Sequence, residues 1–328
     1  MNDSSPVIDF HTHIFDREVC DYVKAMRPAS ATEAQLVDGY VVNAAAHRGR
    51  HPRPGMDEVQ ARLKDMDECG IDVQVIFNHV AQYCYWADAA TGERLARLQN
   101  DRLAEFVARK PERFIGMGTV PLQDVPAAIR EVRRAATELG FKAVAVSSNA
   151  NGAELGDERL WPFWSEVEKL GIAAFIHPSG LNHPRFQKFL MWNGVGQPVE
   201  EAIAMSSLIY EGTLDRFPKL KFGIAHGGGF LPFYAGRVDR NFRARPDATP
   251  GIKKTPSEYM PRFFYDTVVY NVDQLEFLAH KVGPDRIVMG GDYPVGEDDA
   301  VDFVKRAKIS AAAKKMILGE NAVRLLGL

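Results

Sequence analysis

Five polar side chains that can bind a metal ion or move protons lie at the ends of short apolar runs. His11 and His13 close the first run, and His177, His226 and Asp292 close three later runs. Because side chains alternate along a strand, His11 and His13 point the same way and can chelate one divalent ion. The histidine pair is a weak signal by itself, since strand histidines are often incidental. Polar residues at the ends of four runs favour a metal site over unrelated strand-capping residues.

Eight apolar runs, rich in Val, Ile, Phe and Ala, alternate with amphipathic stretches and predict the elements that position these residues. The runs span 7–13, 71–78, 114–121, 141–148, 172–179, 220–227, 263–269 and 287–294. Helices are predicted at 57–70, 97–110, 125–140, 158–170, 199–216, 271–282, 299–307 and 310–326. Each run fits a strand buried on both faces, and eight strand–helix units predict an α/β fold, a (β/α)8 TIM barrel. A doubly wound sheet is the alternative, but the first strand ends in HTH and not in its glycine-rich turn.

Two long stretches depart from the regular alternation of strands and helices. Residues 16–56 follow the first predicted strand, and residues 180–198 follow the fifth. Both insertions come after C-terminal strand ends, where the active sites of such barrels lie. Loops of this length usually have a functional reason. We therefore expect a distorted barrel forming one domain over residues 1–328, in which both insertions wall the active-site pocket.

The composition of the chain argues against some binding partners and indicates a cellular compartment. The 328 residues are 46% hydrophobic and 25% charged, as in globular proteins, and the formal charge of −3 gives no basic field for nucleic acid. No apolar run is long enough to cross a membrane, and the N-terminal residues lack the features of a signal peptide. The three cysteines form no CxxC pair, which argues against a disulfide framework. These features predict a cytoplasmic protein that binds neither nucleic acid nor a membrane.

Seven segments, spread over nearly the whole chain, form a distinctive combination: IDFHTH, DECGIDVQV, HPSG, SLIYEGTLDRFPKLKFGIAHGGG, GRVDR, FFYDTVVYN and DRIVMGGDYP. Together they resemble the amidohydrolase superfamily, in the branch of 2-amino-3-carboxymuconate-6-semialdehyde decarboxylase and related aromatic-acid decarboxylases. The resemblance implies that His11, His13, His177 and Asp292 bind one metal ion, with no bridging carboxylated lysine. It also implies that His226 acts on the metal-bound water or on the substrate. Imidazole ligands suit Zn²⁺, while carboxylate and water ligands suit Mn²⁺, the alternative ion.

Two reactions fit these residues. The first is non-oxidative decarboxylation of an aromatic or unsaturated carboxylic acid, in which a proton replaces the departing CO2. The alternative is hydrolysis of a lactone or amide by a metal-bound hydroxide. His226 and Asp292 are suitable proton carriers in either case. The resemblance favours decarboxylation, while hydration of a double bond is a third possibility because the fold alone does not choose among reactions.

A basic segment in the first insertion is predicted to bind the substrate carboxylate. Arg48, Arg50 and Arg53 lie in HRGRHPR, and arginine makes paired hydrogen bonds to carboxylates. A solvated basic loop is the alternative, and the sequence does not distinguish among the three arginines. The prediction is a small-molecule carboxylate held by one of them.

Four further residues are assigned by position. Trp192, in the second insertion, is predicted to line the pocket, with a core or interface role as the alternative. Phe15 follows the histidine pair closely and is predicted to contact the substrate. The resemblance implies a homodimer in which Arg237 reaches the neighbouring subunit's site, and an intrahelical ion pair with Asp239 or a nearby acidic residue is the alternative. Asp266, within the seventh run, is expected to be structural.

Overall fold

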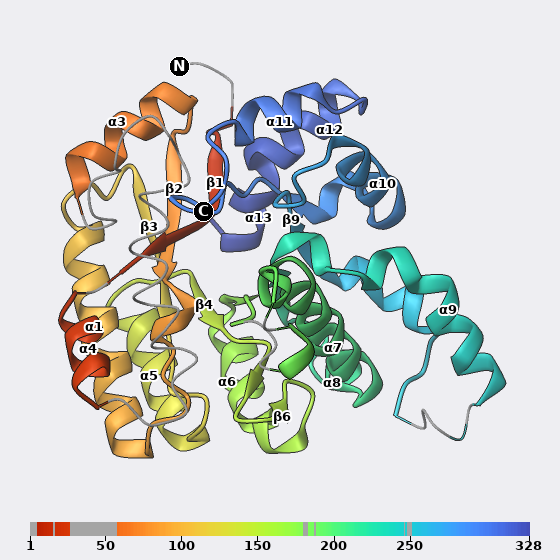
Figure 1. Ribbon diagram of the computed structural model, residues 1–328, viewed down its shortest axis with the longest axis horizontal. Helices are drawn as coiled ribbons and strands as arrows, with labels where there is room; N and C mark the ends of the chain where they lie inside the picture. The colour runs from red at the N-terminus through yellow and green to blue at the C-terminus, as the bar shows by residue number, and fades with distance from the viewer. Residues whose placement is uncertain are drawn as a thin grey trace.

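Eight parallel strands form a barrel in the computed structural model (Figure 1), which describes residues 5–15, 17–26, 58–179, 183–186, 188–245, 247 and 251–328. The neighbour order is β1-β2-β3-β4-β7-β8-β9-β10, and every paired strand is parallel. The strands are β1 (Ile8–Ile14), β2 (Val73–Asn78), β3 (Phe114–Thr119), β4 (Ala143–Val146), β7 (Ala173–Ile176), β8 (Lys221–Ile224), β9 (Phe263–Asp266) and β10 (Ile287–Val288). The (β/α)8 barrel predicted from the alternating runs is confirmed.

The ring closes through the segment that follows β10. Phe10 N donates to Met289 O and His13 N donates to Tyr293 O, both at 2.8 Å. Thr12 and Tyr293 form an isolated parallel bridge. The eighth strand, predicted over 287–294, is therefore only two residues long, and the rest of that run lies alongside β1 as irregular backbone.

Helices cover the outside of the barrel (Figure 1). They are α1 (Arg17–Met26), α3 (Val59–Cys69), α4 (Ala89–Val107), α5 (Val125–Thr137), α6 (Trp161–Leu170), α7 (Gln197–Tyr210), α8 (Thr213–Arg216), α9 (Leu231–Ala244), α10 (Val272–Val282), α11 (Ala300–Arg306), α12 (Ala311–Lys315) and α13 (Asn321–Leu326). Shorter turns are η1 (Val80–Gln82), η2 (Glu158–Leu160), η3 (Pro184–Phe186), η4 (Trp192–Gly196), η5 (His226–Gly228), η7 (Pro256–Arg262), η8 (Pro284–Arg286) and η9 (Met316–Glu320). Asp88 and Asp124 begin α4 and α5 by accepting from backbone N–H groups in the first turn, as N-caps do.

Three elements differ from the prediction. Helix α9 was not predicted, and Figure 1 shows it projecting away from the barrel. A two-stranded hairpin, β5 (Asn149–Ala150) with β6 (Ala153–Glu154), follows β4. The helix predicted over 310–326 is divided near Gly319 by the π turn η9, which separates α12 from α13.

The first insertion is described only in part. Its residues 17–26 form α1, which lies beside α4, where Arg102 donates to Glu18 at 2.9 Å (Figure 1). The predicted substrate arginines, Arg48, Arg50 and Arg53, lie outside the described residues. Among the helices that are described, none combines the length and apolarity needed to cross a membrane.

Aromatic side chains fill the barrel beneath the histidines. The Phe175 ring lies 5.4 Å from the rings of both Phe10 and Phe77, centroid to centroid, and all three side chains are almost fully buried. The His11 ring contacts Phe77 and Phe175 at 5.6 and 5.3 Å. The site therefore rests on a close-packed apolar layer that limits side-chain movement.

Candidate metal centre

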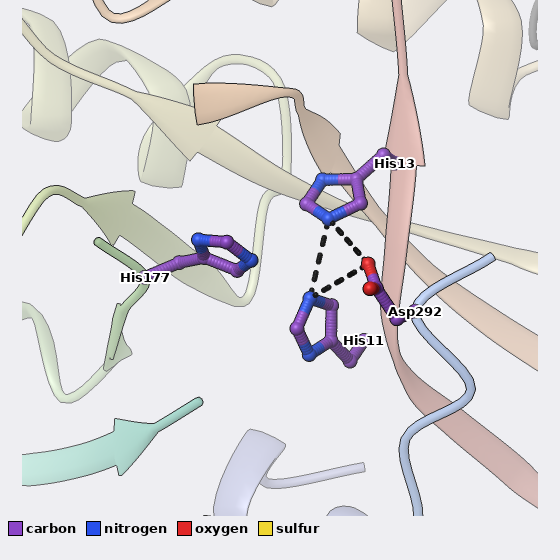
Figure 2. Close-up of side chains that lie close together, drawn as sticks. All are labelled: His11, His13, His177 and Asp292. Atoms are coloured by element: carbon purple, nitrogen blue, oxygen red, sulfur yellow. Dashed lines mark hydrogen bonds and ion pairs between the residues drawn. The ribbon is translucent and has the colours of Figure 1, made fainter. Parts of the chain in front are cut away.

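Four side chains from three strand ends converge at one mouth of the barrel (Figure 2). His11 and His13 lie on β1, His177 directly follows β7, and Asp292 lies in the segment after β10. Their ligand atoms all lie within 4.8 Å of one another, and all four residues are buried. The residues predicted as metal ligands thus form one cluster, which no single segment of the sequence contains.

The spacing of these atoms fits a divalent ion. His11 Nε2 and His13 Nε2 are 3.2 Å apart, and Asp292 Oδ1 lies 3.4 Å from the first and 3.0 Å from the second. Metal–nitrogen bonds of about 2.0–2.1 Å place two ligands of a tetrahedral ion roughly 3.3 Å apart. His177 lies across from these three in Figure 2. The widest separation, 4.8 Å, exceeds this tetrahedral spacing by about 1.5 Å, so the more distant side chain would move inward to close around an ion.

Burial and mutual attraction put the ligands in their metal-binding protonation states. Burial lowers the pKa of His13 to about 4 and that of His177 well below its usual value, so both imidazoles are neutral near neutral pH. Burial alone would raise the pKa of Asp292, but His11 and His13 hold it well below its usual range. Neutral imidazole and ionised carboxylate are the forms that coordinate metal.

Hydrogen bonds to the outer nitrogens orient two of the imidazoles. His11 Nδ1 donates to Asp266 Oδ2 at 2.6 Å, and His177 Nδ1 donates to the Pro178 carbonyl at 3.0 Å. Each bond places the proton on Nδ1 and leaves the Nε2 lone pair for an ion. This arrangement of the donors is the one that a bound metal requires.

A fourth histidine stands beside the cluster, paired with a buried carboxylate. His226 begins η5 after β8, and its ring centroid lies 4.9 Å from that of His177. Its Nδ1 contacts Oε1 of Glu201, a fully buried residue of α7. Burial disfavours the imidazolium form, but the negative charge of Glu201 outweighs this effect and raises the pKa of His226 to about 9. His226 is thereby equipped to hold and release a proton at Nε2.

Two glycines permit the close backbone approaches that the site needs. A Cβ on Gly290 would lie 2.8 Å from His11 Cβ, where the segment after β10 passes β1. Gly229 has φ near +60°, and a Cβ there would lie 2.1 Å from the Pro198 carbonyl oxygen. Side chains at these positions would push the Asp292 segment away from β1 and the His226 turn away from α7.

Three further predicted site residues lie within the described part of the chain: Phe15, Trp192 and Arg237. Phe15 is buried and stacks on His79 with centroids 4.6 Å apart, and the His79 ring lies 5.0 Å from that of His13. Trp192 is partly buried in η4, ahead of α7. Arg237 is exposed on α9. Asp239, which was considered as an ion-pair partner of Arg237, accepts from the backbone N–H and hydroxyl of Ser257.

Two carboxylates at the site were missed or undervalued by the sequence reasoning. Asp266 ends β9, so the rule that polar residues at strand ends meet at the mouth applied to it equally. Glu201 lies inside α7, and no spacing in the sequence connects it to His226. A glutamate among apolar helical residues was the available signal, and it does not reveal which residue the carboxylate faces.

Comparison with known proteins places this geometry among metal-dependent decarboxylases. The family model described as amidohydrolase matches residues 8–328. The chain is 33% identical to a 2-amino-3-carboxymuconate-6-semialdehyde decarboxylase of Dictyostelium discoideum, over 98% of this chain and 91% of the relative. It superposes on 5-carboxyvanillate decarboxylase from Sphingomonas paucimobilis with a TM-score of 0.88 and 29% identity, over 99% and 100% of the chains. It also superposes on a dihydroxybenzoic acid decarboxylase from Polaromonas with bound manganese and 2-nitroresorcinol (TM-score 0.82, 26% identity, 99% and 97% covered).

Proposed function

This chain belongs to the amidohydrolase family and is an enzyme, and we propose that it is a metal-dependent, non-oxidative decarboxylase of an aromatic or unsaturated carboxylic acid. The observation that carries the proposal is the convergence of four ligand atoms within 4.8 Å beside the His226–Glu201 pair. The relatives reported above are decarboxylases, which favours this reaction over hydrolysis by the same ligands.

A single divalent ion is proposed at His11, His13, His177 and Asp292. Three imidazoles favour zinc, whereas the related dihydroxybenzoic acid decarboxylase contains manganese, so manganese is the alternative. Lys142 is exposed and precedes β4, at the end of the strand away from the mouth, which supports a site without a bridging lysine.

Proton delivery falls to the protein's own residues. The ion, when bound, would orient the substrate carboxylate and an adjacent oxygen and would stabilise negative charge there. As the bond to the carboxylate carbon breaks, its electron pair stays on the substrate carbon, and His226 Nε2 delivers a proton to that carbon. Glu201 accepts the hydrogen bond of His226 Nδ1 before and after this transfer. Asp292, within the cluster of four, is a second candidate proton carrier.

We propose that the two insertions and the residues beside the histidine cluster contact the substrate. One of Arg48, Arg50 and Arg53 would hold a carboxylate of the substrate, while Phe15 and Trp192 would supply apolar walls. Phe15 reaches the site through its stack on His79, which supports a role at the edge of the pocket. The insertions 16–56 and 180–198 would enclose the substrate within a single domain over residues 1–328.

An exposed aromatic surface supports the proposed homodimer. It consists of Phe230, Phe233, Tyr234 and Phe277, on and beside α9 and on α10. The Phe233 ring centroid lies 5.4 Å from that of Tyr234 and 5.5 Å from that of Phe277, so these three rings adjoin one another. Exposed apolar surfaces of this kind mark protein interfaces. A second copy covering it would also bury the exposed Arg237 of α9, and Phe233→Asp is expected to yield monomers in light scattering.

A reducing compartment is proposed for the protein. No disulfide joins Cys69 or Cys84 to another described residue, and Cys84 is buried. Cysteines outside disulfides are typical of compartments that keep thiols reduced, such as the cytoplasm.

The test of the proposed function follows metal and products separately. Purified protein would be loaded with zinc or manganese and offered hydroxybenzoates, resorcylates, carboxymuconate semialdehydes, lactones and amides. Release of CO2 that disappears in His177→Ala and Asp292→Ala is the expected result. Acid release without CO2, lost in the same variants, would establish the hydrolase instead. Failure to bind about one ion per chain under any loading condition would overturn the metal site itself.

A further inference from the structure

Asp266 joins the metal ligands to the turn that carries His226. We propose that it is a positioning residue for both, an inference that rests on the proposed metal-dependent function. It ends β9 and is fully buried. Its Oδ2 accepts from His11 Nδ1 at 2.6 Å, while its Oδ1 accepts from the backbone N–H groups of Gly227 and Val268, both at 3.1 Å.

The two oxygens of Asp266 do different jobs. Oδ1 faces two backbone donors, so only an acceptor can occupy that position. Oδ2 fixes the tautomer of His11 with its proton on Nδ1. The lone pair of His11 Nε2 is then directed at the cluster, where that atom lies 3.4 Å from Asp292 Oδ1.

The contact with Gly227 extends this control to the proton carrier. Gly227 directly follows His226 in η5, so its N–H fixes the backbone of the turn that presents the imidazole. A shift of Asp266 would therefore move a metal ligand on β1 and the turn after β8 together. One buried carboxylate sets the position of the ion relative to His226, a distance on which proton transfer depends steeply.

The variant Asp266→Asn separates these contacts without removing side-chain volume. The amide oxygen must stay at the Oδ1 position, because an NH2 group there would face two N–H donors. The NH2 group therefore faces His11 Nδ1, which must become an acceptor and move its proton to Nε2. A proton on Nε2 occupies the lone pair that binds the ion, so metal affinity should fall by about 10- to 100-fold.

The matched control is Asp239→Asn on α9. Asp239 also accepts two hydrogen bonds, from Ser257 N at 2.9 Å and Ser257 Oγ at 2.6 Å, and it is not part of the metal cluster. Metal affinity would be measured by competition with a chromophoric chelator, without substrate. Wild-type affinity in Asp239→Asn and reduced affinity in Asp266→Asn are expected, and equal affinities in the two variants would overturn the proposal.

A second measurement needs no variant and no ion. Long-range ¹H–¹⁵N correlation spectra of the metal-free protein report the tautomer of each histidine, and His11 is expected to carry its proton on Nδ1. Finding the proton on Nε2 would overturn the positioning role of Asp266, even if Asp266→Asn fails to fold. A wild-type protein that binds no metal would instead contradict the proposed function. The two results therefore distinguish a failure of the positioning role from a failure of the proposed function.

Discussion

Glu201→Gln should reduce turnover while leaving metal binding intact. Glu201 is fully buried and its Oε1 contacts His226 Nδ1, whereas its Oε2 has no hydrogen-bond partner among the described residues. Glutamine can keep its oxygen on His226 and place its NH2 group where Oε2 was. The substitution therefore removes the negative charge and retains the hydrogen bond.

The loss of charge sets the size of the effect. Hydrogen bonds that involve a charged group are worth roughly 1 to 2 kcal/mol more than neutral ones, which corresponds to about a 5- to 30-fold decrease in kcat. KM should change little, because a residue with no exposed surface does not touch the substrate. The anion raises the pKa of His226, so its removal lowers that pKa. Because activity that needs protonated His226 is lost as pH rises through its pKa, the alkaline limb should move to lower pH.

Glu200→Gln is the matched control, on the same helix and also buried. Glu200 accepts from Ser148 Oγ at 2.5 Å and from Asn149 Nδ2 at 3.0 Å, away from His226. Initial rates across pH 5 to 10 would be measured for the wild type and both variants, with bound metal quantified in each. The reasoning is refuted if Glu201→Gln retains the kcat and alkaline limb of the wild type, or if Glu200→Gln alters both to the same extent.

Three further outcomes are expected. Removal of the metal ion with a chelator should lower the melting temperature, and adding the ion at about a thousand times its dissociation constant should raise the free energy of unfolding by roughly 4 kcal/mol. An unchanged melting temperature would contradict metal-linked stability. Gly229→Ala should destabilise the protein by about 1 to 3 kcal/mol in urea titrations, since its Cβ would lie 2.1 Å from the Pro198 carbonyl oxygen. The control Gly236→Ala should stabilise the protein, because a Cβ on that residue of α9 would meet open space. Asn100→Ala should lower the free energy of unfolding by about 2 kcal/mol without changing metal affinity, because a buried Glu131 oxygen loses its 2.7 Å hydrogen bond from Asn100. A denaturation midpoint equal to that of the wild type would refute this.

The clustering of these polar residues could be predicted from the sequence because barrel geometry converts position in the chain into position in space, whereas the choice of metal ligands among them came from the family resemblance. Residues at the C-terminal ends of parallel strands meet at one mouth, so His177 and Asp292 could be placed beside His11 without knowing any angle or distance. The same rule covered Asp266, whose role was undervalued because an aspartate within a strand was expected to serve the fold.

Residues carried by helices could not be placed in this way. The side of α7 that faces the site depends on how the helix packs, and the sequence does not reveal this. Glu201 could therefore not be assigned to His226, and its neighbour Glu200 contacts Ser148 after β4 instead. Helix α9 was missed because it begins after a run of glycines and exposes Phe233 and Tyr234, which blurs its amphipathic period.

The junction between the first and last strands gives the ion a second effect. Two ligands lie on β1 and one lies after β10, so a bound ion cross-links the two ends of the chain where only a two-residue strand completes the barrel. Cross-links between distant residues restrict the unfolded chain most. The amides of Phe10 and His13, which donate across this junction, should exchange with deuterium much faster in metal-free protein. Amide exchange at these two residues would thus report ion occupancy without any substrate.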